Sequence, residues 1–156
     1  MTRNKPYYLQ DLRPGMRFVS GSIALTEADI LRFAEEFDPQ PQHTDPQAAQ
    51  HSLFGGLVAS GWHTMALVSS LAMRSELRMA DNQIGLGIRD IRFYHAVRPG
   101  DQLHLEMEIL ETQLSRSRPG WGIIQAHWKA LNQHGDLVLE LQPTIMVRAR
   151  IEDDNP

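Results

Sequence analysis

The second half of the sequence alternates apolar and polar residues with the period of a β-strand. The clearest case is the segment 102–109, whose apolar positions are Leu103, Leu105, Met107 and Ile109. Because successive side chains of a strand point to opposite faces, this alternation predicts one buried and one solvated face. Similar segments at 84–96, 121–131 and 137–147 are separated by turn-rich stretches. Consecutive strands joined by short turns predict an antiparallel sheet.

The longest predicted helix runs from Gly61 to about Met79 and is apolar nearly all round. Such a pattern is typical of a helix enclosed by other structure. The sheet must bury its apolar face, and this helix is the obvious element to bury it against. No repeat, low-complexity tract or linker divides the sequence, so we expect one domain over residues 1–156. The predicted fold class is α+β, with an antiparallel β-sheet wrapped around a long central α-helix.

Composition excludes several classes of function. The sequence contains no cysteine, which rules out a disulfide, a thiolate zinc site and a cysteine nucleophile. It contains no run of about 18 apolar residues and no apolar stretch near its start, so neither a membrane span nor a signal peptide is indicated. The net charge of −4 and the scattered arginines argue against a nucleic-acid partner. We therefore expect a cytoplasmic protein that binds neither membranes nor nucleic acids.

A helix is predicted to end just before a proline-rich stretch. Thr26 and Asp29 form a capping-box pattern that predicts its start. Pro39 and Pro41 predict its end near Phe37, because proline lacks the N–H donor and disfavours the helical conformation in the residue before it.

The stretch that follows, FDPQPQHTD, carries two acids and a histidine. The prolines restrict the backbone between Asp38 and His43, so both side chains are predicted to sit on one rigid turn. Taken alone, Asp38 is equally well explained as a residue that caps this turn. Asp45 precedes Pro46, a pattern typical of an N-cap, and it predicts a short helix over residues 47–51 rather than a catalytic acid.

Five stretches carry a resemblance to a known family: FAEEFDPQPQHTDPQAA, FGGLVASGWH, IRFYHAVRPGD, SRSRPGWG and NQHGD. From about residue 16 to about residue 147, the chain resembles the MaoC-like dehydratases, a group that includes the (R)-specific enoyl-CoA hydratases. The most specific element is an Asp followed by a Pro three residues later and a His five residues later, matched here by Asp38, Pro41 and His43. The resemblance implies a hot dog fold, usually as a homodimer, and activity on acyl thioesters of coenzyme A.

Hydration of an unsaturated thioester needs three kinds of group. A base must take a proton from water, an acid must donate a proton to the α-carbon, and the enolate oxygen must be stabilised. Asp38 and His43 suit the two proton transfers. Ser60 is a good N-cap for the long helix, and the first-turn amides of that helix, that of Gly61 above all, can face a developing oxyanion. The resemblance likewise implies that the residue matching Gly61 makes the oxyanion contact, although the preceding residue is often His in the family and is Ser60 here.

We expect four residues to line the substrate-binding site: Phe54, Gly56, Ser60 and Ser69. Gly55 and Gly56 predict a loop that lets backbone and ligand approach closely, and the role of Ser69 is implied by the resemblance. The chain departs from the family pattern before and within the turn, where it has Phe37, Pro39 and Gln40.

A metal site is an alternative to this interpretation, because His43, Asp45, His51 and His63 lie within 21 residues. No HxxxH or HExxH pair places two of these histidines on one helical face, so we expect no metal. We also expect no redox cofactor, because coenzyme A arrives as part of the substrate. Arg89, Arg92, Arg116 and Arg118 suit the phosphates of coenzyme A but equally suit a solvated strand face.

The leading hypothesis is a hydro-lyase that interconverts a 2-enoyl-CoA and an (R)-3-hydroxyacyl-CoA or dehydrates a related hydroxyacyl thioester. The alternatives are an acyl-CoA-binding protein without catalysis and an acyl-CoA thioesterase. A sheet around one helix leaves an edge strand exposed, and pairing two such edges across a two-fold axis predicts a homodimer or a dimer of dimers.

Overall fold

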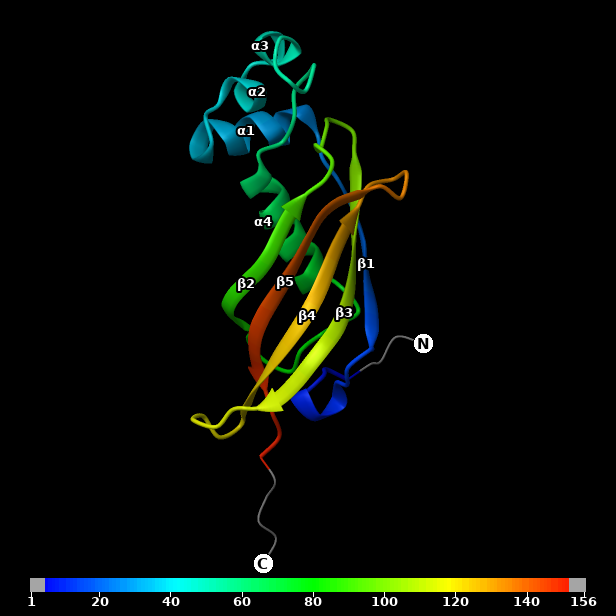
Figure 1. Cartoon of the computed structure of the whole chain (residues 1–156), viewed down its shortest axis with the longest axis vertical. Helices are drawn as coiled ribbons and strands as arrows, with labels where there is room; N and C mark the ends of the chain where they lie inside the picture. Colours follow the sequence, from blue (N-terminus) through cyan, green and yellow to red (C-terminus); the bar gives the residue numbers. More distant parts are fainter. Residues whose placement is uncertain (1–4, 152–156) are drawn as a thin grey trace, which may run out of the picture.

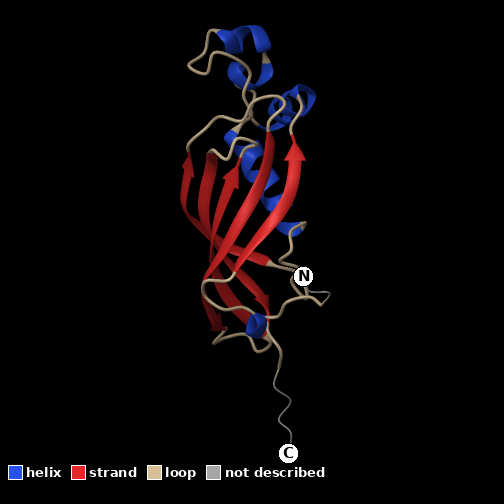
Figure 2. Ribbon diagram, turned by 90° about the vertical axis from the view of Figure 1, so that its right-hand side faces the viewer, coloured by secondary structure: helices blue, strands red, loops and turns tan. Residues whose placement is uncertain are grey.

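The sheet has five antiparallel strands in the order β1-β3-β4-β5-β2. The structure is a computed structural model and describes residues 5–151, so the single-domain prediction for residues 1–156 extends at both ends beyond the described residues. The strands are β1 (Arg17–Ala24), β2 (Ile84–Phe93), β3 (Gln102–Leu114), β4 (Trp121–Leu131) and β5 (Leu137–Arg148). The sheet curves around one helix, as Figures 1 and 2 show. This arrangement confirms the predicted fold class.

The helices divide into a central one and a small group at one end of the sheet. The central helix is α4 (Gly61–Met73), and the group consists of α1 (Glu27–Phe37), α2 (Pro41–Thr44) and α3 (Pro46–Gln50). A short 3-10 helix, η1 (Leu9–Asp11), precedes β1. Figure 1 shows α1, α2 and α3 above the end of α4 at which Gly61 begins the helix. The turn between α1 and α2 is thereby brought close to the start of α4. Within residues 5–151, no helix is long and apolar enough to span a membrane.

The ends of α1 confirm the predicted capping. The Thr26 side chain accepts a hydrogen bond from the Asp29 N–H, and the Asp29 carboxylate accepts one from the Thr26 N–H, both at 3.1 Å. The helix ends at Phe37, as the prolines predict. The sequence did not predict α2, in which Pro41 occupies the first helical position, where its missing N–H costs nothing.

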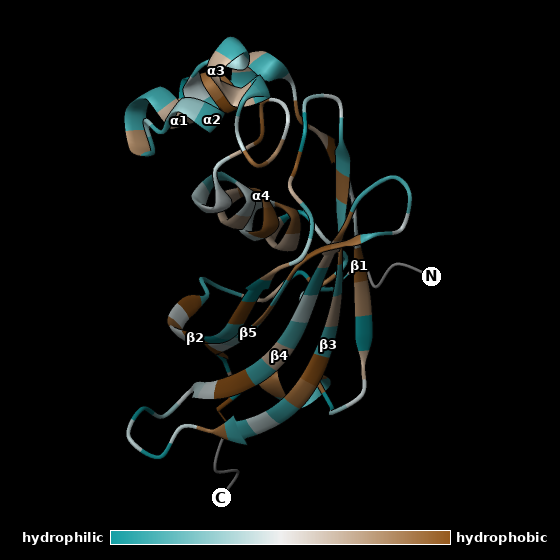
Figure 3. Ribbon diagram, turned by 45° about the horizontal axis from the view of Figure 1, so that its top comes forward, coloured by the Kyte–Doolittle hydropathy of each residue, from teal (hydrophilic) through white to brown (hydrophobic). Residues whose placement is uncertain are grey.

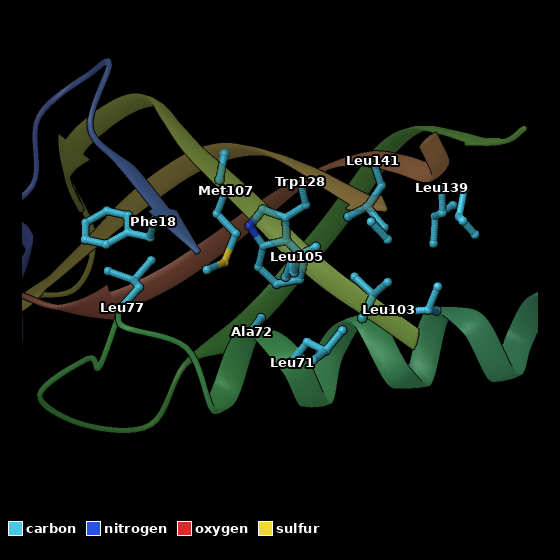
Figure 4. Close-up of a cluster of buried hydrophobic side chains, with 14 of the residues drawn as sticks. Phe18, Leu71, Ala72, Leu77, Leu103, Leu105, Met107, Trp128, Leu139 and Leu141 are labelled. Atoms are coloured by element: carbon cyan, nitrogen blue, oxygen red, sulfur yellow. The ribbon is translucent and has the colours of Figure 1, made fainter. Parts of the chain in front are cut away.

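The core lies between α4 and the concave face of the sheet (Figure 4). The alternation predicted for residues 102–109 is confirmed, because its four apolar side chains are all buried. The side chains of α4 that meet the sheet are Val68, Leu71 and Ala72. Figure 3 shows α4 lying over strands whose colour alternates between hydrophobic and hydrophilic residues. Each fully buried aliphatic side chain of this kind stabilises a fold by about 1.5–3 kcal/mol relative to exposure.

The central helix is shorter than predicted, because it ends at Met73 rather than near Met79. The Ser75 hydroxyl donates to the Ala72 carbonyl at 2.7 Å and accepts from the Leu77 N–H at 3.2 Å. These local side-chain bonds replace the helical ones. The chain then turns, and Leu77 enters the core from outside the helix.

Strand β2 differs from the predicted pattern of one buried and one solvated face. All ten of its residues are exposed, and the strand lies at the edge of the sheet, where among the described strands it pairs only with β5. Its exposed apolar residues are Ile84, Leu86, Ile88, Ile91 and Phe93.

Candidate active site

Asp38 lies directly after α1, and both of its carboxylate oxygens accept a hydrogen bond. The Ser60 hydroxyl donates to Oδ2 at 2.6 Å, and the Gln40 amide donates to Oδ1 at 2.7 Å. These two hydrogen bonds, of which the one from Ser60 has the larger effect, hold the pKa of Asp38 below its ordinary value. Desolvation acts in the opposite direction. The group is therefore a carboxylate at neutral pH.

His43 is held by the backbone in one orientation. It lies in the short helix α2 and is buried. Its Nδ1 is 2.7 Å from the Val58 carbonyl oxygen, which can only accept a hydrogen bond, so Nδ1 carries the proton. In the neutral ring, Nε2 is then an acceptor, and it lies 3.5 Å from Asp38 Oδ2. A water molecule in contact with both atoms would donate one of its two protons to each.

Ser60 and Gly61 bring the start of α4 to this pair. Ser60 is fully buried, and its hydroxyl accepts the Trp62 N–H at 3.2 Å, so it is the N-cap of α4 as predicted. The first N–H groups of a helix have no acceptor within the helix and carry the positive end of its dipole. The Gly61 amide is one of these groups. A Cβ at Gly61 would lie 3.1 Å from the Phe93 ring, so a larger residue here would press against that side chain of β2.

Two cavities meet beside these groups. The first, of about 330 Å³, is lined by Asp38, Gln40, His43, Gly61, Trp62, Met65, Ile91 and Phe93. The second, of about 290 Å³, is lined by Gln42, His43, Phe54, Val58, Ala59, Gly61, Thr64 and residues 93–97. Both include His43, Gly61 and Phe93, so the Phe93 ring stands where they meet. An extended ligand can reach the Asp38 and His43 pair from either side.

Comparison with known proteins identifies the family. Residues 11–120 match the model of the MaoC like domain. The chain belongs to the MaoC-like domain family. This finding confirms the resemblance noted in the sequence, and the matched region contains the turn, the start of α4 and β2.

Two solved structures and one sequence relative match this MaoC-like domain over most of their length. The crystal structure of the MaoC-like dehydratase from Rhodospirillum rubrum is 43% identical, with a TM-score of 0.87 over 92% of this chain and 98% of that one. The (R)-hydratase PhaJ1 from Pseudomonas aeruginosa is 26% identical, with a TM-score of 0.71 over 92% of this chain and 86% of that one. The uncharacterized protein YdeM of Bacillus subtilis is 30% identical over 140 residues, which are 90% of this chain and 98% of that protein. The two solved structures support the hot dog fold, and they are a dehydratase and a hydratase by name.

Three other residues of the MaoC-like domain were expected to line the substrate-binding site, and no contact in the structure tests this expectation. Phe54 lines the second cavity. Gly56 lies under Arg98, whose guanidinium would be 3.3 Å from a Cβ at this position. Ser69 lines a third cavity, of about 240 Å³, between α4 and β2, which shares Met65 with the first. Their substrate contacts stay predictions, as does that of Ser60.

The sequence did not single out several groups that complete the site. Val58 binds His43 through its backbone carbonyl, a contact that no residue type reveals. Phe93 and Ile91 come from a strand whose position over α4 depends on the fold. Arg98 donates to the Phe54 carbonyl at 2.6 Å and so holds the loop beside the second cavity. The resemblance motif that contains Arg98 was a signal, but it did not assign the residue a role.

The other histidines and acids of the proposed metal cluster have separate positions. Asp45 caps α3 by accepting the N–H groups of Gln47 and Ala48, which confirms the predicted helix cap. His63 is buried and stacks on Phe33 with ring centroids 4.4 Å apart. Among the described residues, no three histidine, aspartate or glutamate side chains are grouped so that they could hold a metal ion. The expected absence of a cofactor stays a prediction.

The arginines considered for coenzyme A binding lie apart from the cavities beside Asp38. Arg89 donates to Gln125 on the neighbouring part of the sheet at 2.8 Å. Arg116 and Arg118 lie in the turn between β3 and β4, which Figure 1 shows at the opposite end of the sheet from α2. Their role as phosphate ligands stays a prediction.

Proposed function

We propose that the protein hydrates a 2-enoyl-CoA to an (R)-3-hydroxyacyl-CoA, or dehydrates a related hydroxyacyl thioester in the reverse sense. The observation that carries this proposal is the pair of acceptors, His43 Nε2 and Asp38 Oδ2, that lie 3.5 Å apart beside the first amide of α4. The (R)-hydratase and dehydratase names of the structural relatives support the same reaction class.

The reaction adds the hydroxyl of one water to the β-carbon and a proton to the α-carbon. Asp38 and His43 hold the water and take its proton as its oxygen bonds to the β-carbon. The Gly61 amide stabilises the enolate oxygen that forms at the thioester carbonyl. The protonated pair then returns the proton to the α-carbon, which regenerates both side chains. No metal or redox cofactor takes part, and coenzyme A belongs to the substrate.

The decisive experiment follows the loss of the conjugated thioester absorbance with crotonyl-CoA and with longer, branched and dicarboxylic enoyl-CoAs. Turnover by the parent protein, and its loss in Asp38→Asn and His43→Ala, would support the proposal. Release of free thiol would instead indicate a thioesterase. Binding of the acyl-CoA without either reaction would indicate a binding protein.

We also propose that two copies pair through β2. This edge strand exposes five large apolar side chains, and the neighbouring Trp62 of α4 is 69% exposed. An apolar edge left open to water is an aggregation hazard, and a two-fold pairing removes it. A second copy would also cover the open side of the cavities that Ile91 and Phe93 line. The cytoplasmic location stays a prediction.

A further inference from the structure

The Ser60 hydroxyl contacts both halves of the candidate site. It donates its proton to Asp38 Oδ2 at 2.6 Å and accepts the Trp62 N–H at 3.2 Å. One bond reaches the acid and base pair, and the other reaches the first turn of α4. Asp38 and Ser60 are 22 residues apart in the sequence.

This hydroxyl has no second proton to donate to a substrate oxygen. A serine hydroxyl has a single proton, and that proton is committed to Asp38. Ser60 is fully buried, so no solvent water can replace either bond. A helix cap requires only an acceptor, which several residue types supply. The donation to Asp38 is therefore the feature that specifically requires a hydroxyl.

Gln40 holds the other oxygen of the same carboxylate. Its amide donates to Asp38 Oδ1 at 2.7 Å, while its own Oε1 accepts from the Gln42 amide at 3.1 Å. With one donor on each oxygen, the plane of the carboxylate is defined. Gln40 is exposed, and its hydrogen bond competes with water, whereas that of Ser60 does not. Ser60 is accordingly the stronger of the two constraints.

We propose that Ser60 is a positioning residue that holds the Asp38 carboxylate in alignment with the Gly61 amide, and that it does not bind the substrate directly. This inference rests on the proposed function for its kinetic consequence, but its structural consequence can be measured without turnover. The lowered pKa of Asp38, for which the Ser60 hydrogen bond is the largest cause, agrees with it.

The test compares Ser60→Ala with Ser60→Gly. Both variants remove the hydroxyl, but glycine at an N-cap costs a helix much less than alanine does. The matched control is Thr26→Ala, which removes the hydroxyl that caps α1 and donates to Asp29, at a residue that lines neither cavity beside Asp38. Carbon-detected NMR gives the titration of the Asp38 carboxyl, and Asp38→Asn identifies its resonance.

The expected result is the same rise in the pKa of Asp38 in both Ser60 variants, despite their different melting temperatures, and no change in Thr26→Ala. With an active substrate, the acid limb of kcat/KM against pH should move to higher pH by the same amount. At neutral pH, kcat should fall by about tenfold or more, because a hydrogen bond to a charged group is lost, while KM changes little.

An Asp38 titration that is unchanged in both Ser60 variants would overturn the inference. A loss of kcat that follows the melting temperature across the two variants would also overturn it, because that result is expected if Ser60 acts only as the N-cap of α4. A parent protein that turns over no enoyl-CoA would sink the proposed function, and the NMR titration would still decide the position of Ser60.

Discussion

His43 Nε2 lies 3.5 Å from Asp38 Oδ2, and the Val58 carbonyl binds Nδ1, so that in the neutral ring both facing atoms are acceptors. Two acceptors at this separation do not bond each other, but they can share one water. In the proposed hydration, both residues would therefore be needed, and the pair would act as a unit.

Replacement of His43 by Ala should lower kcat by about 10²–10⁴-fold, the usual contribution of a positioned acid or base. Asp38→Asn should cause a loss of similar size, and the double variant should be little worse than either single one, because the two residues act on one water. The measurement is steady-state hydration of crotonyl-CoA. His51→Ala is the matched control, since His51 is exposed and lines neither of the two cavities beside Asp38. Full activity in His43→Ala would refute the assigned role.

Substitution of Gly61 by Ala should lower kcat roughly tenfold to a hundredfold, with little effect on stability. The new Cβ would meet the Phe93 ring at 3.1 Å, and the half-exposed ring can move away only by disturbing the cavity beside the amide. Gly21→Ala is the matched control, because a Cβ there meets nothing within 4 Å. If Gly61→Ala and Gly21→Ala turn over crotonyl-CoA equally well, the close contact between Gly61 and the Phe93 ring does not shape the reacting site.

Light scattering should give a solution mass of twice 17.7 kDa or a multiple of that dimer. Leu86→Lys places a charge on the apolar edge of β2 and should shift the protein toward the monomer. Val19→Lys makes the same kind of change on β1, the opposite edge of the sheet, where Val19 is comparably exposed at 46%. It should leave the mass unchanged. A monomeric parent protein at micromolar concentration would contradict pairing through β2.

The stability of the protein should fall as the pH drops below about 6.5, the ordinary pKa of histidine. Burial lowers the pKa of His63, so the folded state binds its proton less readily than the unfolded state does. Its contribution is therefore complete above the unfolded pKa and is lost as the pH falls below it. Asp29 opposes this shift and Arg32 reinforces it.

The measurement for His63 is the melting temperature from pH 8 to pH 5. His63→Leu should lose part of the decrease on acidification, whereas His51→Leu, at an exposed position, should not. Equal pH dependence in the parent protein and His63→Leu would show that another group is responsible.

Local patterns predicted much of the fold because they act over a few residues. The capping box at Thr26 and the cap at Asp45 are interactions between neighbours along the chain. The alternation from Leu103 to Ile109 is a local pattern too, although its buried face also needed α4 to cover it. The end of α4 was predicted wrongly, because the apolar residues after Met73 enter the core from a turn and not from a helix.

The sequence by itself determined the strand period, the helix caps and the spacing of Asp38 and His43, since each follows from residue type and short-range backbone geometry. Only the tertiary structure decided which groups surround that pair. The Ser60 hydroxyl, the Val58 carbonyl and the Phe93 ring reach it from segments 15 to 55 residues away from Asp38 or His43, as packing of α4 and β2 brings them together. A contact of this kind depends on the relative placement of whole elements, which the burial of many apolar side chains sets collectively and no short motif encodes.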